Sequence, residues 1–258
     1  MISDKLYAEW LEAEQRPFEG FDFSYFSDKC IDEQPPWSYS AMVREEMADI
    51  QAVLDIGTGG AEFLMTFQDI FPDYVVALES HPPNLKLAQK RLEPLGGAVL
   101  DFSADEERRM PLDDGRFDLV LDRHMAYNVA DVERVLKPGG CFLTQQVDGR
   151  NFDDFSACFE CEQYWTYFTL DYALNKLRTE SHLIVEEAEE WTGRMIFFDV
   201  ATLIYFIQAV PWLIPPGFTV DKYRPHLAGL QARLEKEGEL AFTQRRFFIQ
   251  ARKPGELC

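Results

Sequence analysis

The sequence predicts an α/β fold, a doubly wound parallel sheet with a helical cap before its last strand. Apolar runs typical of buried parallel strands alternate with helix-like segments between residues 50 and 148. A glycine-rich turn, residues 57–60, directly follows the first of these runs, and acids stand near the ends of the first two, at Asp55 and Glu79. Because ligands bind at the C-terminal ends of the strands in such sheets, these positions predict a nucleotide-type pocket.

Five apolar segments are predicted as strands of this core, and three intervening segments as helices. The strands are expected over residues 53–55, 74–78, 97–101, 116–122 and 141–147. The helices are expected over residues 61–70, 83–92 and 131–136. Pro72 ends the first helix, Pro83 suits the first turn of the second, and the KPGG sequence ends the third.

The rest of the chain divides into segments of different character. An aromatic, Pro-bearing segment at 17–39 lies between two short amphipathic helices, 2–14 and 40–49, and either closes over the ligand as a lid or packs on the outside. Beyond the core strands we expect helices at 153–180, 197–210 and 221–237 and strands at 182–191 and 243–251. The predicted domains are N-terminal helices with an aromatic lid (1–49), a pocket-bearing core (50–191), a helical cap (192–241) and the last core strand (242–258).

Composition limits the partners of the chain. The 258 residues carry a formal net charge of −20, which disfavours a nucleic acid partner because such binding depends on Lys and Arg against phosphates. The 21 Phe residues favour a closed apolar pocket. The five cysteines are scattered, and the pair Cys158 and Cys161 is more consistent with ordinary thiols than with zinc or redox chemistry, so no metal is expected. A charged N-terminal segment and apolar stretches too short for a membrane span predict a cytoplasmic protein.

The residues around the glycine turn indicate which nucleotide fits. In the dinucleotide-binding fingerprint the sixth position is Gly or Ala, whereas counting from Gly57 this position is Glu62, whose carboxylate would repel a pyrophosphate. Asp55 adds a second negative charge, so the turn suits a cationic ligand without phosphate, such as S-adenosylmethionine. Glu79 lies 24 positions beyond Asp55, near the interval of about 20 residues at which an acid accepts hydrogen bonds from the ribose hydroxyls. Asp105, in the loop after the third strand, can accept from the adenine amino group.

These motifs together resemble those of class I S-adenosylmethionine-dependent methyltransferases. The resemblance covers about residues 50 to 148 and is carried by VLDIGTGGAEF, VVALES, DEERRMPLDDGRFDLVL and VLKPGGCFLTQQ. It implies a Rossmann-like, seven-stranded sheet whose last strand is antiparallel. It also implies a cofactor site in which Asp55, Gly57, Thr58 and Gly59 hold the methionine end, Glu79 and Ser80 the ribose, and Ala104 and Asp105 the adenine.

The end of the fourth strand supplies the candidate for catalysis. His124 is predicted to act as a base or as a group that orients the acceptor, and Arg123 to face a carboxylate, that of the cofactor or that of the acceptor. Aromatic residues that could line the acceptor pocket are Tyr25, Trp37, Tyr39 and Trp212.

The leading hypothesis is a methyltransferase for a small apolar or aromatic acceptor. The alternatives are an RNA or protein methyltransferase, a cofactor-binding protein without catalysis, and a nicotinamide oxidoreductase, which Glu62 disfavours.

Overall fold

The computed structural model describes residues 2–17, 28–214 and 216–255. The chain divides into two compact units. Unit 1 comprises the described parts of residues 1–35, 149–167 and 191–245, and unit 2 those of residues 36–148, 168–190 and 246–258. Residues 149–167, which the sequence pattern placed in the core, therefore lie in unit 1. The role of residues 192–241 as a cap stays a prediction.

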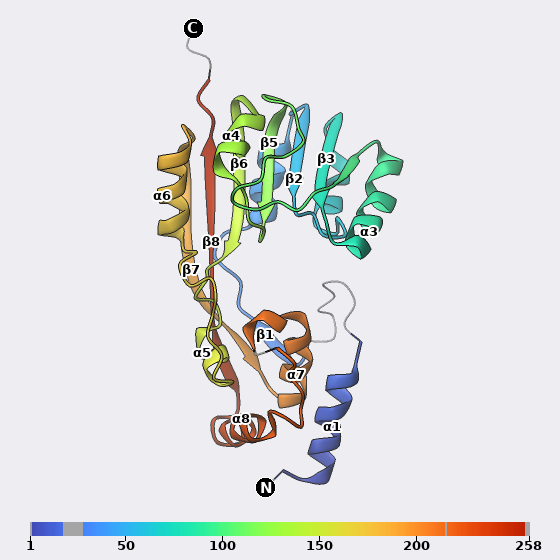
Figure 1. The fold of residues 1–258 in the computed structure, drawn as a ribbon, viewed down its shortest axis with the longest axis vertical. Coiled ribbons are helices and arrows are strands. Elements are labelled where there is room, and N and C mark those ends of the chain that lie inside the picture. Colours follow the sequence, from blue (N-terminus) through green and yellow to red (C-terminus); the bar gives the residue numbers. More distant parts are fainter. Residues whose placement is uncertain (1, 18–27, 215, 256–258) are drawn as a thin grey trace. The chain divides into compact units, whose positions relative to one another are not determined.

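The described strands form one sheet in the order β1-β7-β8-β6-β5-β2-β3-β4 (Figure 1). The strands β2 to β6 pair in parallel, whereas β8 is antiparallel to β6 and β1 is antiparallel to β7. Their bounds are β1 (Cys30–Asp32), β2 (Ala52–Ile56), β3 (Tyr74–Glu79), β4 (Ala98–Asp101), β5 (Phe117–Arg123), β6 (Leu136–Val147), β7 (Ile184–Phe197) and β8 (Leu240–Arg252). The predicted doubly wound α/β fold with an antiparallel last strand is confirmed. The sheet has eight described strands rather than seven because the three residues of β1 add to its edge.

Eight α-helices and three 3₁₀ helices are described. The α-helices are α1 (Asp4–Gln15), α2 (Tyr39–Met47), α3 (Pro82–Leu92), α4 (Val129–Val135), α5 (Asp153–Ala157), α6 (Leu170–Glu180), α7 (Val200–Ala209) and α8 (Arg224–Glu237). The 3₁₀ helices are η2 (Leu64–Ile70), η3 (Glu93–Leu95) and η4 (Pro211–Leu213). Side-chain caps explain several of the starts, because Ser3, Ser38, Asn128, Thr169 and Asp199 each accept a hydrogen bond from the backbone of the first turn.

Two helical elements differ from the prediction. Residues 61–70 were expected as an α-helix, but only the 3₁₀ helix η2 forms there, because Ala61 has a φ of +66° and the segment ends before Pro72. Residues 153–180 were expected as one helix, but α5 ends at Ala157 and α6 begins at Leu170, so the residues between form a loop.

Helices cover both faces of the sheet within unit 2. On one face, buried side chains of β5 and β6 pack with those of α4 and α6, including Val132 and Leu177. On the other face, buried side chains of β2, β3 and β5 pack with those of α2, η2 and α3, including Val43 and Leu64. The alternation of side chains along each strand therefore assigns Asp55 and Arg123 to the α2 face and Asp122 to the α4 face.

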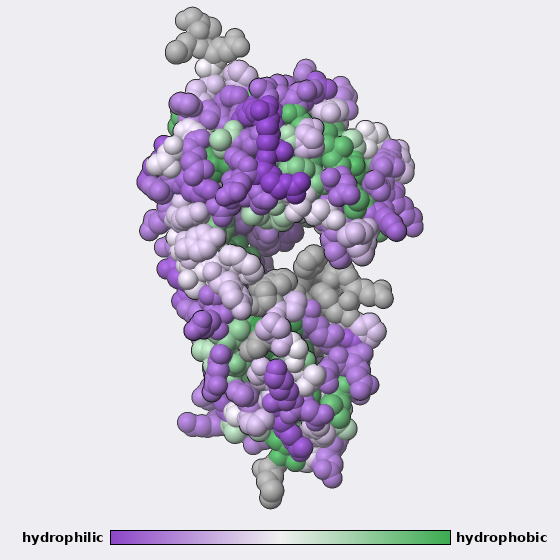
Figure 2. Space-filling model, in the orientation of Figure 1, coloured by the Kyte–Doolittle hydropathy of each residue, from purple (hydrophilic) through white to green (hydrophobic). Residues whose placement is uncertain are grey.

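Unit 1 has an apolar core of its own, built around α1, α7 and α8. Its fully buried aromatic side chains include Trp10, Phe155, Phe197 and Phe242. Hydrophilic side chains cover most of the molecular face drawn in Figure 2. No helix in the described part of the chain combines the length and apolar character needed to cross a membrane.

Candidate functional site

The turn after β2 brings bare backbone to the C-terminal edge of the sheet. Gly57 and Gly59 have φ angles of +70° and +63°, which favour glycine, and the Thr58 amide donates to the carbonyl of Leu78 at 3.0 Å. A Cβ atom on Gly57 would lie 2.8 Å from the Cβ atom of Met125, whereas one on Gly59 would meet nothing closer than a Glu62 oxygen at 3.9 Å. Gly57 therefore permits close packing inside the protein, and Gly59 leaves open space beside the turn.

The residues that follow the turn do not form a phosphate site. No α-helix begins there, so the aligned backbone N–H groups that bind a pyrophosphate are missing from this part of the described chain. Glu62 stands at the sixth position of the fingerprint as predicted, but its carboxylate forms an ion pair with Arg91, which also donates to the carbonyl of Gly60. A dinucleotide is therefore disfavoured by the lack of a helix start in this described segment and by Asp55, rather than by a free charge at Glu62.

Asp55 is a buried carboxyl at the end of β2. Asp55 is 5% exposed, and burial raises its pKa to about 6, with partial compensation from the neighbouring Thr58 and from the charge of Arg123. The negative charge of Glu79 adds to this rise. A cationic group beside Asp55 would favour its charged form, so this position suits the ammonium group of an amino acid.

Glu79 ends β3 with one carboxylate oxygen engaged and the other available. Its Oε1 accepts from the amides of Ser80 and His81 at 2.8 and 2.7 Å. Its Oε2 accepts no hydrogen bond from any residue in the described ranges. The two amide bonds fix the orientation of the carboxylate, which can therefore receive a hydroxyl on its second oxygen.

Asp105 lies in the loop after β4, and its carboxylate stabilises that loop. The Oδ1 atom accepts from the amides of Glu107 and Arg108 at 2.8 and 2.7 Å, and these bonds lower the pKa of Asp105. Ala104 is buried beside it, and the Arg108 guanidinium lies 4.7 Å from the centre of the Phe102 ring. The predicted adenine acid thus has one oxygen committed to its own loop and one oxygen left for a ligand.

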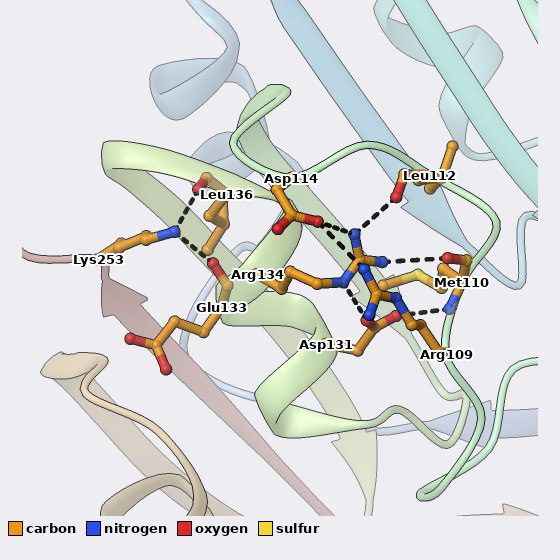
Figure 3. A network of polar contacts seen from close by, with 9 residues as sticks. All are labelled: Arg109, Met110, Leu112, Asp114, Asp131, Glu133, Arg134, Leu136 and Lys253. Atoms are coloured by element: carbon orange, nitrogen blue, oxygen red, sulfur yellow. Dashed lines mark hydrogen bonds and ion pairs between the residues drawn. The ribbon is translucent and has the colours of Figure 1, made fainter.

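The loop that carries Asp105 is attached to α4 and α6. Arg134 of α4 donates to Asp131 and Asp114 and to the carbonyls of Leu112 and Met110, at 2.6 to 3.0 Å (Figure 3). The Asp131 carboxylate in turn accepts from the Met110 amide at 2.6 Å. On the α6 side, Glu106 accepts from Tyr172 at 2.9 Å and from Lys176 at 2.7 Å. These contacts hold the loop against α4 and α6.

The end of β5 presents Arg123 and His124, as the sequence predicted. The Arg123 guanidinium lies 4.6 Å from the centre of the Phe63 ring and forms no hydrogen bond or ion pair within the described part of the chain. The backbone of His124 has a φ of +65°, and its amide donates to the carbonyl of Gln145 at 2.9 Å. Desolvation by the surrounding protein, together with the charges of Arg123 and Arg246, lowers the pKa of His124 well below its usual range.

Sequence reasoning missed two features of this region. Gln145 contacts both Trp37 and His124, at 2.9 and 3.3 Å, and the polar TQQ sequence inside the otherwise apolar β6 was the signal that could have revealed it. Asp122 is completely buried on the opposite face, where its Oδ1 accepts from Gln146, and burial raises its pKa well above the usual range.

The aromatic residues that were predicted to line the acceptor pocket differ in their surroundings. Trp37 is half-buried beside Gln145. Tyr39 is a core residue, 5% exposed, whose hydroxyl donates to the carbonyls of Asp122 and Leu143. Tyr25 and the side chain of Trp212 lie outside the described residues.

Comparison with known proteins shows a similarity between the central part of the chain and methyltransferases. Residues 54–144 match the model of a family described as a methyltransferase domain. Over 91 residues the chain is 34% identical to a phthiotriol/phenolphthiotriol dimycocerosates methyltransferase of Mycobacterium tuberculosis. That alignment covers 33% of this chain and 32% of the relative, so the chain spans about a third of the length of the curated relatives it matches. Residues 54–144 are therefore similar to a methyltransferase domain.

Solved structures share the fold of most of this chain. A putative methyltransferase from Bacillus halodurans has a TM-score of 0.56 at 21% identity, with 83% of this chain and 98% of that chain covered. The [4+2]-cyclase SpnF has a TM-score of 0.52 at 16% identity, with 88% and 87% covered. At these identities the structures show the fold alone, and the cyclase shows that the fold is also found in a protein named for another reaction.

Proposed function

We propose that this protein is an S-adenosylmethionine-dependent methyltransferase that acts on a small-molecule acceptor. The observation that carries the proposal is the acidic glycine turn. Asp55 and Glu79 lie at the C-terminal ends of the neighbouring strands β2 and β3, and the half-buried Gly59 lies between them in the chain. A ligand with an ammonium group and ribose hydroxyls, and without phosphate, satisfies both carboxyls.

The described residues fit such a cofactor in three parts. Asp55, Gly57, Thr58 and Gly59 hold its methionine end. Glu79 and Ser80 hold the ribose through the free Oε2 atom, and Ala104 and Asp105 hold the adenine through the free Oδ2 atom. Support comes from the committed Oε1 and Oδ1 atoms, because these bonds fix each carboxylate before a ligand arrives.

When bound, S-adenosylmethionine supplies an electrophilic methyl group on a cationic sulfur. The protein must then align the acceptor with that methyl group and exclude water. The site at the end of β5 is the place from which Arg123 and His124 would orient the acceptor. Residues 18–27 of the predicted lid (17–39) lie outside the described residues, and the cap formed by residues 192–241 stays a prediction.

The acceptor is proposed to be a small molecule rather than RNA or protein. The net charge of −20 opposes an RNA partner, and the mycobacterial relative is named for phthiotriol and phenolphthiotriol dimycocerosates rather than for a nucleic acid.

Binding of S-adenosylhomocysteine to the purified protein, measured by calorimetry, tests the cofactor. We expect binding near micromolar affinity, and Glu79→Ala should weaken it about tenfold to a hundredfold through loss of a charge-assisted hydrogen bond. Asp101→Ala is the matched control, because Asp101 pairs with Glu79 in the sheet register but is exposed at the end of β4.

Two outcomes would count against the cofactor assignment. Preference for NADH over S-adenosylhomocysteine would contradict the proposal. Equal effects of Glu79→Ala and Asp101→Ala would contradict the role of Glu79.

A further inference from the structure

We propose that Arg123 and His124 bind a carboxylate group of the methyl acceptor, with His124 acting as a neutral hydrogen-bond donor rather than as a base. The inference rests on the proposed function, which it deepens by naming the acceptor as an acid. It is carried by the open guanidinium of Arg123, by a side-chain relay that fixes the tautomer of His124, and by the location of both residues at the end of β5.

Among the described residues, the Arg123 side chain is held in place by ring contacts rather than by its hydrogen-bond donors. It stacks on Phe63, whose ring lies 5.6 Å from that of Tyr39 and 5.1 Å from that of Phe67. These aromatic contacts restrain the guanidinium, but all five of its N–H groups are available, since no described residue accepts from them. A planar fork of donors in a fixed orientation is the geometry that binds carboxylates in a bidentate manner.

A relay from Trp37 through Gln145 determines which nitrogen of His124 carries the proton. The indole Nε1–H of Trp37 can only donate, so the Gln145 atom 2.9 Å from it is the carbonyl oxygen. The Gln145 amide nitrogen, a donor, then lies 3.3 Å from His124 Nε2, which must accept. In a neutral imidazole the remaining nitrogen, Nδ1, carries the hydrogen.

This tautomer removes His124 from the role of general base. Its Nε2 lone pair is occupied by the Gln145 amide, and its Nδ1 atom presents a hydrogen. The low pKa of His124 keeps the ring neutral at physiological pH, in agreement with the relay. Of the two roles that the sequence predicted for His124, orientation of the acceptor is therefore the one that the geometry supports.

Sheet register places this pair beside the half of the site assigned to the cofactor. Arg123 pairs with Gln145, and Gln145 pairs with Phe248 of β8, so their side chains share one face of the sheet where β5 ends. The acids assigned to the cofactor follow β2, β3 and β4, on the other side of β5 in the strand order. Trp37, which contacts Phe248 at 5.0 Å, and Phe63 add aromatic surface, which favours an acid on an apolar or aromatic body.

The experiment compares phenylacetate with its neutral amide, phenylacetamide, by calorimetry on the full chain saturated with S-adenosylhomocysteine. We expect wild type to prefer the acid by about tenfold or more, and Arg123→Met to lose that preference. Arg123→Met should leave S-adenosylhomocysteine affinity within about twofold of wild type. Arg116→Met is the matched control, because Arg116 also stacks on an aromatic ring, Tyr74 at 4.3 Å, but precedes the start of β5.

A second pair of variants tests His124. Asn at this position retains an amide donor near the place of Nδ1–H and tolerates the positive φ, whereas Ala removes the donor. We expect His124→Asn to keep most of the preference for the acid and His124→Ala to lose it. Nitrogen-15 spectra of the histidine rings should show His124 as the neutral Nδ1–H tautomer, and Trp37→Phe should produce a mixture of tautomers.

Different results would overturn the carboxylate inference and the proposed function. Equal or undetectable binding of the acid by wild type, or an Nε2–H tautomer of His124, would overturn the inference while leaving the cofactor assignment intact. If Arg123→Met weakens S-adenosylhomocysteine tenfold, the carboxylate at Arg123 belongs to the cofactor and the inference is wrong. Failure of wild type to bind S-adenosylhomocysteine at all would instead overturn the proposed function.

Discussion

At the scale of single residues, Asp55 has opposite effects on folding and on the binding of a cationic ligand. Its charged form is costly inside the folded protein, but it is the form that an ammonium group requires. The unfolded chain releases the Asp55 proton near pH 3.8, and the folded protein releases it near pH 6. Between these values unfolding releases a proton, so the contribution of Asp55 to stability falls as pH rises through this window.

Asp55→Asn is therefore expected to stabilise the ligand-free protein above pH 6. The gain should be on the order of 3 kcal/mol and should disappear below about pH 4, where Asp55 is protonated in both states. Urea unfolding at several pH values between 4 and 7.5, with Asp101→Asn as an exposed control, measures the difference. Parallel stability curves for wild type and Asp55→Asn would show that Asp55 ionises normally.

Residue-scale details were also the hardest to predict from sequence. Asp55, Gly57 and Glu79 could be located because each follows an apolar strand, a pattern that is local in the chain. The relay from Trp37 through Gln145 to His124 joins residues up to 108 positions apart, so no local pattern reports it. Pairing in the sheet creates that site, and only the structure supplies the pairing.

At the scale of elements, the contacts of Arg134 connect α4 to the loop that carries the predicted adenine residues. Arg134 is 14% exposed and Asp131 is 5% exposed, so both charges depend on their mutual contact (Figure 3). Arg134→Met would leave the Asp131 carboxylate buried without its ion pair and should cost about 3 kcal/mol of unfolding free energy.

Urea unfolding of single and double variants can isolate this contact. Asp131→Asn combined with Arg134→Met should recover part of the loss, since no unpaired charge then remains. Arg109→Met is the control, because Arg109 contacts the same Asp114 from an exposed position and should change stability by less than about 0.5 kcal/mol. An equal loss for Arg109→Met and Arg134→Met would rule out the special role of Arg134.

Some helices and strands can be predicted from local sequence patterns, and others cannot. The apolar runs of β2, β3 and β5 are recognisable because both faces of a parallel sheet are buried. By contrast, α5 and α6 were merged because the residues between them contain no strong helix breaker, and β1 was missed because three residues carry too little pattern. Such short elements depend on tertiary contacts rather than on their own sequence.

At the scale of the whole molecule, the net charge of −20 opposes folding through self-repulsion. Added salt screens charges separated by more than about 10 Å at 0.1 M, so it should weaken this repulsion more than it weakens close ion pairs. We expect the melting temperature of the ligand-free protein to rise by a few degrees between ~10 mM and ~150 mM NaCl. A flat or falling melting temperature would show that close ion pairs dominate. Sodium sulfate at matched ionic strength separates screening from salt-specific effects.

The strand order has a consequence for the timing of folding during synthesis. Strands β2 to β6 can pair as soon as residue 147 has left the ribosome, but β8 separates β6 from β7 in the finished sheet. β7 and β1 therefore have no place beside the nascent core until residues 240–252 have been made. For the time needed to translate about a hundred residues, at roughly 5–20 residues per second, the edge of β6 is open to pairing with another chain. Protection of this edge by a chaperone is thus most needed late in translation, after the methyltransferase motifs have already folded.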